Sequence, residues 1–297
     1  MNIKKLYLYV TSPLSWRYER RRGSLPLGIR KITDRMFRVY ELWRVSRSVT
    51  RVMGFRFSRS RTFIEIDLTY NCTLQCAGCN RSIDKAPSDK RVEIDDIKNF
   101  IKASIQKGHR WKGIRVLGGE PTLHSDFSAI IELLRGYKKS HLPTLRITVV
   151  TNGNTDHTRS LLEQLPGDIF VENTAKKQGV QYDFAPFNKA PKDNPNNKNS
   201  DYRNGCWITE GLGMGLTPYG YYHCAIAGNI DRIYNFGLAR DKIPDNDDPM
   251  YEEMSTLCAL CGHFFISENN DPSQEVISKS WRDAYASWQG QCGKGIS

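Results

Sequence analysis

Three closely spaced cysteines place the strongest constraint on how this chain can fold. Cys72, Cys76 and Cys79 follow a short apolar run, residues 63–68, with the spacing C-x3-C-x2-C. Thiolates at this spacing, on a loop that leaves a strand, can converge on one soft metal centre. A structural zinc site or an electron-transfer cluster takes four protein ligands, whereas this local group supplies three. The pattern therefore predicts a metal centre with one open coordination position at the end of a strand.

The composition is that of an ordinary soluble globular protein. Of the 297 residues, 39% are hydrophobic and 25% are charged, which provides ample material for a core. No apolar run is long enough to span a membrane, and the N-terminus lacks the apolar region of a signal peptide. Eight cysteines without a secretory signal favour metal binding over disulfides. We therefore expect a cytoplasmic protein.

Strand-like runs alternate with helical patterns between residues 62 and 190. Such alternation predicts a parallel sheet whose crossover helices cover it, and ligands then gather at the C-terminal ends of the strands. Five or six such units would form an open or partial barrel. The strand-like runs are 62–68, 114–117, 145–150 and 169–171, with 182–187 as a weaker candidate, and the helical patterns are 94–105, 127–134 and 161–165.

A second motif follows the second predicted strand. Gly118 and Gly119 would let the backbone approach a ligand closely, and the carboxylate of Glu120 could bind an ammonium group. An ordinary Gly-Gly turn ended by Pro121 is the alternative, and it would be preferred if the motif stood alone. Its position at the end of the strand beside the cysteine loop favours a ligand site.

These motifs resemble the radical S-adenosylmethionine (radical SAM) superfamily. The resemblance rests on Cys72, Cys76 and Cys79, on the GGEP of residues 118–121, and on the turn Thr151, Asn152 and Gly153 after the third strand. It implies a partial (β/α)6 barrel and a 4Fe–4S cluster held by the three cysteines. It also implies that the amino and carboxylate groups of S-adenosylmethionine bind the fourth iron and that the GGE segment bonds the amino group. One electron would then release a 5′-deoxyadenosyl radical, which abstracts hydrogen from a substrate.

Two positions near these motifs bear on the cosubstrate. Family members often carry an aromatic residue just before the third cysteine, against the adenine, whereas this chain has Gly78, as a subset of the family does. Glu172 and Asn173, after the fourth strand, are weaker candidates for contacts to ribose or methionine, and a solvated loop is the alternative.

A second cysteine group lies near the C-terminus, within residues 204–297 and after a loop or linker at 189–203. Its members are Cys206, Cys224, Cys258 and Cys261, enough for a closed cluster or for zinc. A predicted hairpin, 211–217 to 221–224, places Cys224 on its return strand. The arrangement resembles the twitch domain, the shorter relative of the SPASM domain, which implies an auxiliary 4Fe–4S cluster. A zinc site and unliganded thiols are the alternatives.

Three further side chains have weaker functional readings. Cys292 resembles the lone cysteine with which some radical enzymes return a hydrogen atom to a substrate, although an exposed tail thiol without a role is the preferred interpretation. His223 and His263 flank cysteines of the second group, and we expect them to pack against the cluster or tune it.

Positive charge is concentrated at the N-terminus. Residues 1–61 contain 16 Lys or Arg and 3 Asp or Glu, a net charge of +13, whereas the whole chain has +11, so that residues 62–297 carry −2. From residue 29 the pattern is helical. The segment could be a solvated helix packed on the barrel or a grip for a polyanion such as nucleic acid. Binding to an anionic membrane surface or to a lipid-linked substrate is slightly favoured. The side chains that would enter the lipid are Trp16, Phe37, Tyr40, Leu42 and Trp43.

Together these patterns predict a three-part radical SAM enzyme: a basic helical extension (1–61), a radical SAM core (62–190) and a twitch-like auxiliary-cluster domain (204–297). The auxiliary cluster would assist oxidation or epimerisation of a carbohydrate-like or lipid-linked small molecule. An external reductant such as flavodoxin or ferredoxin is expected, as is a cytoplasmic protein that can lie at the inner membrane face. A radical SAM peptide maturase and a non-catalytic zinc-binding protein are the alternatives.

Overall fold

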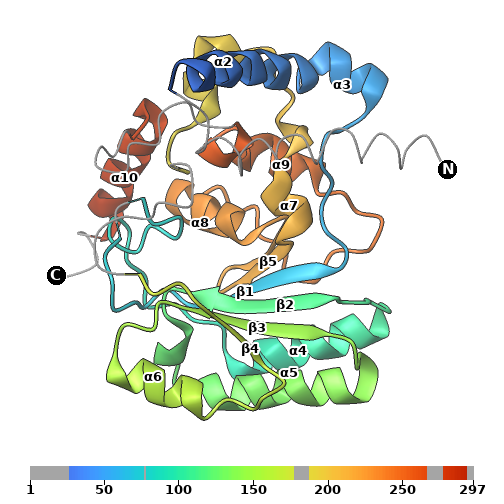
Figure 1. The fold of residues 1–297 in the computed structure, drawn as a ribbon, viewed down its shortest axis with the longest axis vertical. Helices are drawn as coiled ribbons and strands as arrows, with labels where there is room; N and C mark the ends of the chain where they lie inside the picture. The colour runs from blue at the N-terminus through green and yellow to red at the C-terminus, as the bar shows by residue number, and fades with distance from the viewer. Residues whose placement is uncertain (1–26, 77, 177–186, 266–276, 293–297) are drawn as a thin grey trace.

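A six-stranded sheet runs through the middle of the protein (Figure 1). The computed structural model describes residues 27–76, 78–176, 187–265 and 277–292. In these residues the strand order is β4-β3-β2-β1-β5-β6, with β1 to β5 parallel and β6 antiparallel to β5. The strands are β1 (Phe63–Thr69), β2 (Gly113–Gly118), β3 (Arg146–Thr151), β4 (Phe170–Asn173), β5 (Met214–Thr217) and β6 (Gly220–Tyr222).

Three helices cover one face of the sheet, at the bottom of Figure 1. They are the crossovers α4 (Ile94–Gln106), α5 (Phe127–His141) and α6 (Asp156–Glu163). Local capping explains where two of them begin: Glu93 and Asp96 form a reciprocal capping box for α4, and the hydroxyl of Thr155 accepts from the amide of Thr158 in α6. The predicted alternation of strands and helices is confirmed, with ends that differ by a few residues.

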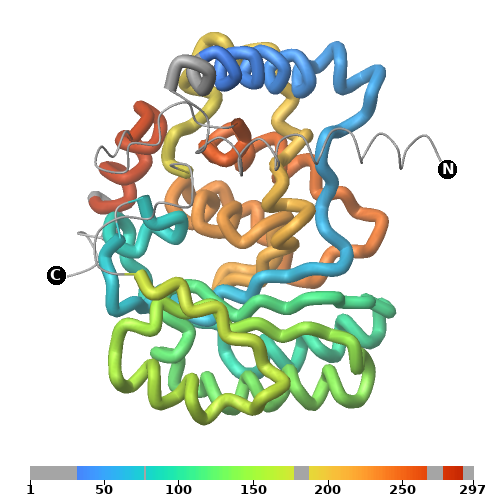
Figure 2. Tube along the Cα trace, in the orientation of Figure 1, coloured from blue at the N-terminus to red at the C-terminus, as the bar shows by residue number. Residues whose placement is uncertain are grey.

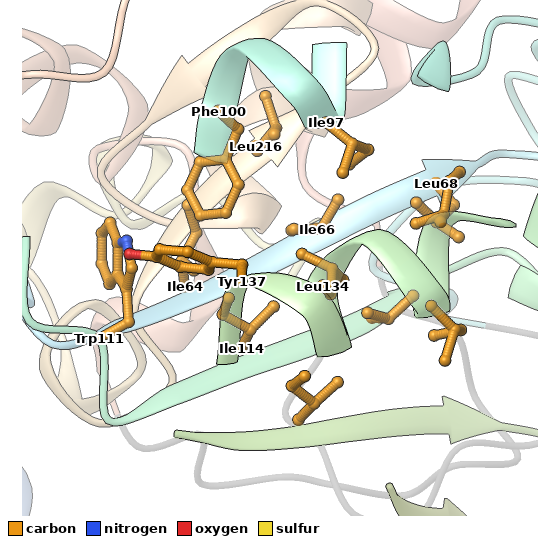
Figure 3. Close-up of a cluster of buried hydrophobic side chains, with 14 of the residues drawn as sticks. Ile64, Ile66, Leu68, Ile97, Phe100, Trp111, Ile114, Leu134, Tyr137 and Leu216 are labelled. Carbon is orange, nitrogen blue, oxygen red and sulfur yellow. The ribbon is translucent and has the colours of Figure 1, made fainter. Parts of the chain in front are cut away.

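The main core lies between the sheet and these helices (Figure 3). Alternate side chains of β1 enter it, because successive residues of a strand point to opposite faces. Those on the other face of β1, Glu65 and Asp67, are charged and also buried. The core residues labelled in Figure 3 are Ile64, Ile66, Leu68, Ile97, Phe100, Trp111, Ile114, Leu134, Tyr137 and Leu216.

The C-terminal part of the chain covers the opposite face. The predicted hairpin is confirmed as β5 and β6, although Cys224 follows β6 as the N-cap of α8 and does not lie on the return strand. Strand β5 lies parallel to β1. A Cβ on Gly213 would stand 2.1 Å from the carbonyl oxygen of Phe63, so this approach requires glycine. The helices of this layer are α7 (Trp207–Gly211), α8 (Ala225–Tyr234), α9 (Tyr251–Leu257) and α10 (Lys279–Cys292).

This topology differs from six successive βα units. In the described residues, four strands are linked through α4, α5 and α6, and the hairpin then joins the sheet beside β1. One sheet thus contains strands from both the predicted core and the predicted cysteine-rich segment. The weak strand candidate 182–187 lies outside the described residues except for Phe187, which is buried in a turn.

Two N-terminal helices lie at the edge of the molecule farthest from α5 and α6 (Figures 1 and 2). They are α2 (Leu27–Arg44), which includes the helix predicted from residue 29, and α3 (Arg47–Met53). The predicted loop 189–203 holds them, since the amide of Asp201 donates to the Val45 carbonyl over 2.7 Å. It is built from the short 3-10 turns Pro191–Asp193, Pro195–Asn197 and Tyr202–Asn204. Among the described residues, no helix has the length and apolarity needed to cross a membrane.

Candidate active site and second cysteine site

A pocket of about 140 Å³ opens at the C-terminal ends of β1, β2 and β3. Residues far apart in the sequence meet there because parallel strands end at the same edge of a sheet. It brings together the first cysteine group and parts of both motifs that follow the next strands. Its lining includes Cys72, Cys76, Cys79, Gly118, Gly119, Thr151, Asn152 and Glu172, whereas Glu120, Pro121, Gly153 and Asn173 do not line it.

The two glycines let β2 end directly against the start of the cysteine loop. Gly118 has φ of +128°, and a Cβ there would lie 2.4 Å from the carbonyl oxygen of Thr69. A Cβ on Gly119 would lie 2.1 Å from the carbonyl oxygen of Asn71. The amides of Gly119 and Glu120 donate to these carbonyls over 2.7 and 2.8 Å. The motif therefore holds the backbone from which the three cysteines follow.

The side chain of Glu120 joins the ends of two neighbouring strands. Its carboxylate is fully buried and accepts hydrogen bonds from the Thr151 hydroxyl (2.8 and 2.9 Å) and the Asn152 amide (2.9 Å). It also caps the 3-10 turn Pro121–Leu123 through the hydroxyl of Thr122. Its two oxygens thus tie the ends of β2 and β3 together, and the binding of an ammonium group by this carboxylate stays a prediction.

Asn152 links the third strand to the cysteine loop. Its side-chain amide donates to the Thr73 hydroxyl over 3.3 Å and to the sulfur of Cys72 over 3.7 Å. Gly153, with φ of +62°, completes the turn beside Asn173. Burial raises the pKa of the thiols of Cys72 and Cys76, and the neighbouring Cys79 adds to both shifts. Thiolates here would therefore need a bound cation such as a metal centre, which is the chemistry that an iron–sulfur cluster supplies.

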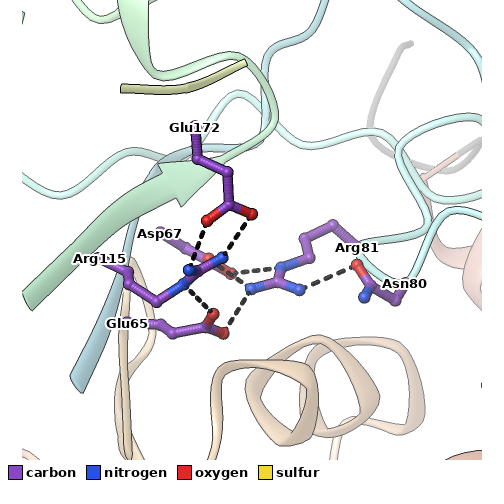
Figure 4. A network of polar contacts seen from close by, with 6 residues as sticks. All are labelled: Glu65, Asp67, Asn80, Arg81, Arg115 and Glu172. Atoms are coloured by element: carbon purple, nitrogen blue, oxygen red, sulfur yellow. Dashed lines mark hydrogen bonds and ion pairs between the residues drawn. The ribbon is translucent and has the colours of Figure 1, made fainter. Parts of the chain in front are cut away.

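A charged network lies against the same pocket (Figure 4). Arg81 donates to Asp67 over 3.0 and 3.1 Å and to Glu65 over 3.3 Å. Arg115 donates to Glu65 over 3.2 Å and to Glu172 over 2.7 and 3.2 Å. Of these five residues, all except Asp67 line the pocket. The pocket therefore offers fixed donors and acceptors next to the cysteines.

Charge pairing decides the ionisation of this network. Burial alone would lower the pKa of Arg81, but Asp67 and Glu65 outweigh it and raise that pKa. Burial raises the pKa of Glu65, and the two guanidinium groups offset this shift only in part. Sequence reasoning missed the network except for Glu172. A signal was available in the sequence, because Glu65 and Asp67 occupy alternate positions of an apolar strand. The register that pairs Glu65 with Arg115 is visible only in the structure.

The segment after Cys79 is held by helices of the C-terminal layer. The side chain of Asn229 in α8 donates to the carbonyl of Asn80 over 3.0 Å, and Arg232 donates to the carbonyl of Arg81 over 2.8 Å. The hydroxyl groups of Ser82 and Tyr285, the latter in α10, are 2.8 Å apart. Because α8 begins directly after Cys224, the two cysteine groups are joined through one helix.

The four cysteines of the second group are all buried and surround one small apolar cavity. They are Cys206 before α7, Cys224 before α8, and Cys258 and Cys261 after α9. Burial, with the nearby Cys206, raises the pKa of Cys224 to about 12. Burial and the other thiols also raise the pKa values of Cys258 and Cys261 well above the usual value. Four soft donors in a dry site fit a positively charged metal centre that would let them ionise.

Histidine contacts complete the second site. A ring nitrogen of His223, Nε2, is 3.3 Å from the sulfur of Cys258, and burial lowers the pKa of His223 to about 3, so the ring is neutral. Burial lowers the pKa of His263 to about 4. In the part of the chain that the structure describes, no three His, Cys, Asp or Glu side chains stand as ligands of a single metal ion. Cys292 ends α10, and its side chain lies outside the described residues.

The family comparison agrees with this geometry. Residues 66–167 match the model of the Radical SAM superfamily, a range that includes the first cysteine group, the GGEP motif and the Thr-Asn-Gly turn. This segment of the chain is therefore a radical SAM domain, as the sequence motifs predict.

Curated relatives share this segment. A GTP 3′,8-cyclase of Campylobacter jejuni is 30% identical over 100 residues, which are 33% of this chain and 29% of that protein. A probable GTP 3′,8-cyclase of Pyrococcus abyssi is 30% identical over 110 residues, which are 37% of this chain and 32% of that protein. The matches thus span about a third of the length of either relative.

Solved structures show weaker similarity over longer stretches. BtrN in complex with AdoMet and 2-DOIA matches 74% of this chain and 98% of its own at 15% identity, with a TM-score of 0.42. SuiB of Streptococcus suis bound to the precursor peptide SuiA matches 42% of this chain and 25% of its own at 17% identity, with a TM-score of 0.29.

Proposed function

We propose that this protein is a radical SAM enzyme with an auxiliary 4Fe–4S cluster. The observation that carries the proposal is the pocket at the strand ends, where Cys72, Cys76 and Cys79 meet the backbone of Gly118 and Gly119. When bound, a reduced cluster would supply the electron that splits S-adenosylmethionine into methionine and a 5′-deoxyadenosyl radical, which takes a hydrogen atom from the substrate. Thr151 and Asn152 would contact the cosubstrate from β3.

The remaining lining of the pocket supports a polar, carbohydrate-like substrate. Glu65, Arg81 and Arg115 present paired carboxylates and guanidinium groups, which can accept from and donate to hydroxyl groups without leaving a buried charge unpaired. Leu212 and Ile226 line the same pocket, and Ile226 is two residues after Cys224. A substrate held here would lie between the two cysteine groups.

The second cysteine group would serve as an electron acceptor. Loss of a hydrogen atom leaves the substrate as a radical, and loss of one more electron and one proton gives the oxidised product. Cys206, Cys224, Cys258 and Cys261 could hold the cluster that takes that electron, while the proton leaves to solvent. An external reductant such as flavodoxin or ferredoxin would supply the first electron. In epimerisation, the alternative outcome, the substrate radical would gain a hydrogen atom instead of losing an electron.

Cyclisation or rearrangement is the second candidate. It is favoured by the names of the curated relatives, GTP 3′,8-cyclases, which share 30% identity with the segment that carries the first cysteine group. That outcome needs no net oxidation, so the second cysteine group would then bind the substrate or stabilise the fold.

Anaerobic reconstitution with iron and sulfide tests the proposal. We expect roughly eight iron atoms per chain, four for each cluster, and brown protein with charge-transfer absorption. Cys76→Ala should lose about half of the iron, and Cys261→Ala should lose the other half. Cys292→Ala is the matched control and should keep the full content, because Cys292 belongs to neither group. A colourless, zinc-loaded protein would instead support the non-catalytic alternative.

Activity assays separate the two candidates. With dithionite and S-adenosylmethionine, the wild type should release 5′-deoxyadenosine, measured by chromatography and mass spectrometry, and Cys76→Ala should release none. Product masses from incubation with candidate sugars, aminocyclitols, GTP or a precursor peptide encoded nearby then identify the reaction. A product two mass units lighter than its substrate indicates oxidation, and an unchanged mass with a new connectivity indicates rearrangement. A modified peptide would identify a maturase.

A further inference from the structure

Helix α2 buries charged side chains and exposes large apolar ones, which is unusual for a surface helix. Its inward side carries Glu41 and Arg44, both almost fully buried. Glu41 pairs with Arg56 over 2.9 Å, and Arg44 donates to the carbonyl of Gly54 over 3.1 Å. Arg38 also turns inward, where it donates to Asn197 over 3.1 Å. A helix of a globular protein normally points such side chains at water.

Large apolar side chains form the outward side of the same helix. Ile32, Met36, Val39 and Trp43 recur at steps of three and four residues, so they lie in one stripe. Their exposed fractions are 63%, 68%, 62% and 51%. At 1.5 Å per residue, the stripe is about 17 Å long. Helix α3 continues it with Val52 and Met53.

Exposed positive charge lies on the same two helices. Arg35 on α2 and both Arg47 and Arg51 on α3 are exposed. Residues 32–61 contain only two acidic side chains, of which Asp34 is half-buried and Glu41 is buried in its ion pair. The exposed part of α2 and α3, here called their outer face, thus combines large apolar side chains with positive charge, which is complementary to an anionic surface with an apolar interior.

We propose that the outer face of α2 and α3 docks on an anionic lipid membrane. Ile32, Met36, Val39 and Trp43 would enter the boundary between headgroups and acyl chains, and the three arginines would contact the phosphates. The residues differ from those predicted from the sequence. Leu42 packs inward on the cluster of Val45, Met254, Cys258, Phe264 and Phe265; Phe37 and Tyr40 are partly buried; and Trp16 lies outside the described residues.

A lipid surface fits this face better than nucleic acid does, because phosphate contacts need no stripe of exposed apolar side chains. Figure 1 places α2 and α3 at the outer edge of the molecule, away from α4, α5 and α6, so a flat surface can reach them. The proposal is independent of the reaction at the pocket, which lies at the strand ends.

Sedimentation with vesicles tests the proposal on the full-length protein. The wild type should bind vesicles of phosphatidylcholine with phosphatidylglycerol far better than vesicles of phosphatidylcholine alone. The double variant Met36→Glu and Val39→Glu should lose at least tenfold in binding. Replacing Arg35, Arg47 and Arg51 with Gln should lose on the order of a hundredfold at low salt, since each arginine near such a surface contributes roughly fivefold. Ile105→Glu, at an exposed apolar position of α4, is the matched control and should bind like the wild type.

Several outcomes would overturn the proposal. Equal binding by the wild type and the Met36→Glu, Val39→Glu variant would mean that another segment of the chain covers the stripe or that lipid does not contact it. Sensitivity to the arginine changes alone would show that charge holds the protein on the vesicle and that the apolar stripe does not enter the lipid. A wild-type dimer by light scattering that the double variant makes monomeric, with vesicle binding unchanged, would assign the stripe to a second copy of the chain. Circular dichroism must show the variants to be folded, and the 5′-deoxyadenosine assay gives an independent check.

Discussion

Replacing Arg81 with Met should destabilise the protein strongly, because Arg81 neutralises two buried carboxylates at once. Asp67 is fully buried and Glu65 nearly so, and Arg81 is bonded to both. Removal of one partner from a buried ion pair typically costs about 3–5 kcal/mol. Glu65 keeps Arg115, whereas Asp67 loses its guanidinium partner, so we expect a loss of roughly 4 kcal/mol near pH 8. For a chain of this size that corresponds to a midpoint on the order of 10 °C lower.

The same variant should show a defined pH dependence. Burial already raises the pKa of Glu65, and without Arg81 that pKa rises further. A carboxyl whose pKa is higher in the folded state than in the unfolded state holds more protons when folded, so stability falls as pH rises between the two values. The deficit of the variant relative to the wild type should therefore be larger at pH 8 than at pH 6.

Urea denaturation of anaerobically purified protein, followed by circular dichroism at both pH values, measures these effects. Arg81→Lys keeps the positive charge but not the bidentate hydrogen bonding, so it should lose less stability than Arg81→Met. Lys98→Met, which removes an exposed pair with Asp95, is the control and should leave the midpoint unchanged. The reasoning is refuted if Arg81→Met unfolds within 1 kcal/mol of the wild type, or if its deficit is equal at pH 6 and pH 8.

Three further predictions follow from single side chains. Gly119→Ala would place a Cβ 2.1 Å from the Asn71 carbonyl oxygen and should deplete iron at the first cysteine group but not at the second. Gly136→Ala, on α5, has open space around the new Cβ and should stabilise the protein by about 0.5–1 kcal/mol in urea denaturation. Glu120→Gln should lower the free energy of unfolding by about 1–3 kcal/mol in urea denaturation, because an NH2 group would face the donors of Thr151 and Asn152. An unchanged midpoint would contradict a stabilising role for these hydrogen bonds. Burial, together with the charges of Arg59 and Lys107, lowers the pKa of His109. The wild type should therefore lose stability as pH falls below about 6.5, and His109→Phe should lose less. The same change of unfolding free energy with pH in both proteins would count against this.

The local patterns were sufficient for much of the fold. Strands β1 to β4 and helices α4, α5 and α6 appear near the positions that their apolar periodicity predicts. The meeting of Cys72 with Gly118 and Asn152 also follows from sequence, since each residue comes just after a strand of one parallel sheet. The sequence also predicts that the four cysteines of the second group act together, although their spacing in the chain cannot show that they surround one cavity.

Other features of the fold depend on which distant segments of the chain pack against each strand and helix. The pattern of β5 does not indicate that it pairs with β1, more than 140 residues earlier. The motif around Glu120 predicts a ligand site, but it does not indicate that the hydroxyl of Thr151 and the amide of Asn152 donate to this carboxylate. The periodicity of α2 predicts a helix but not which of its sides is buried: the protein buries the side with Glu41 and Arg44 and leaves Met36 and Val39 outside.

Sequence alone determined the chemical inventory of this protein: two cysteine groups, a glycine motif after a strand, an α/β alternation and a basic N-terminal segment. These are short-range properties, written in residue spacing and period. Tertiary structure decided where charge is paired, with Arg81 between Glu65 and Asp67, and which face of α2 meets solvent. The physical reason is that desolvation and pairing depend on contacts between distant segments, and such contacts exist only once the sheet has formed and both of its faces are covered.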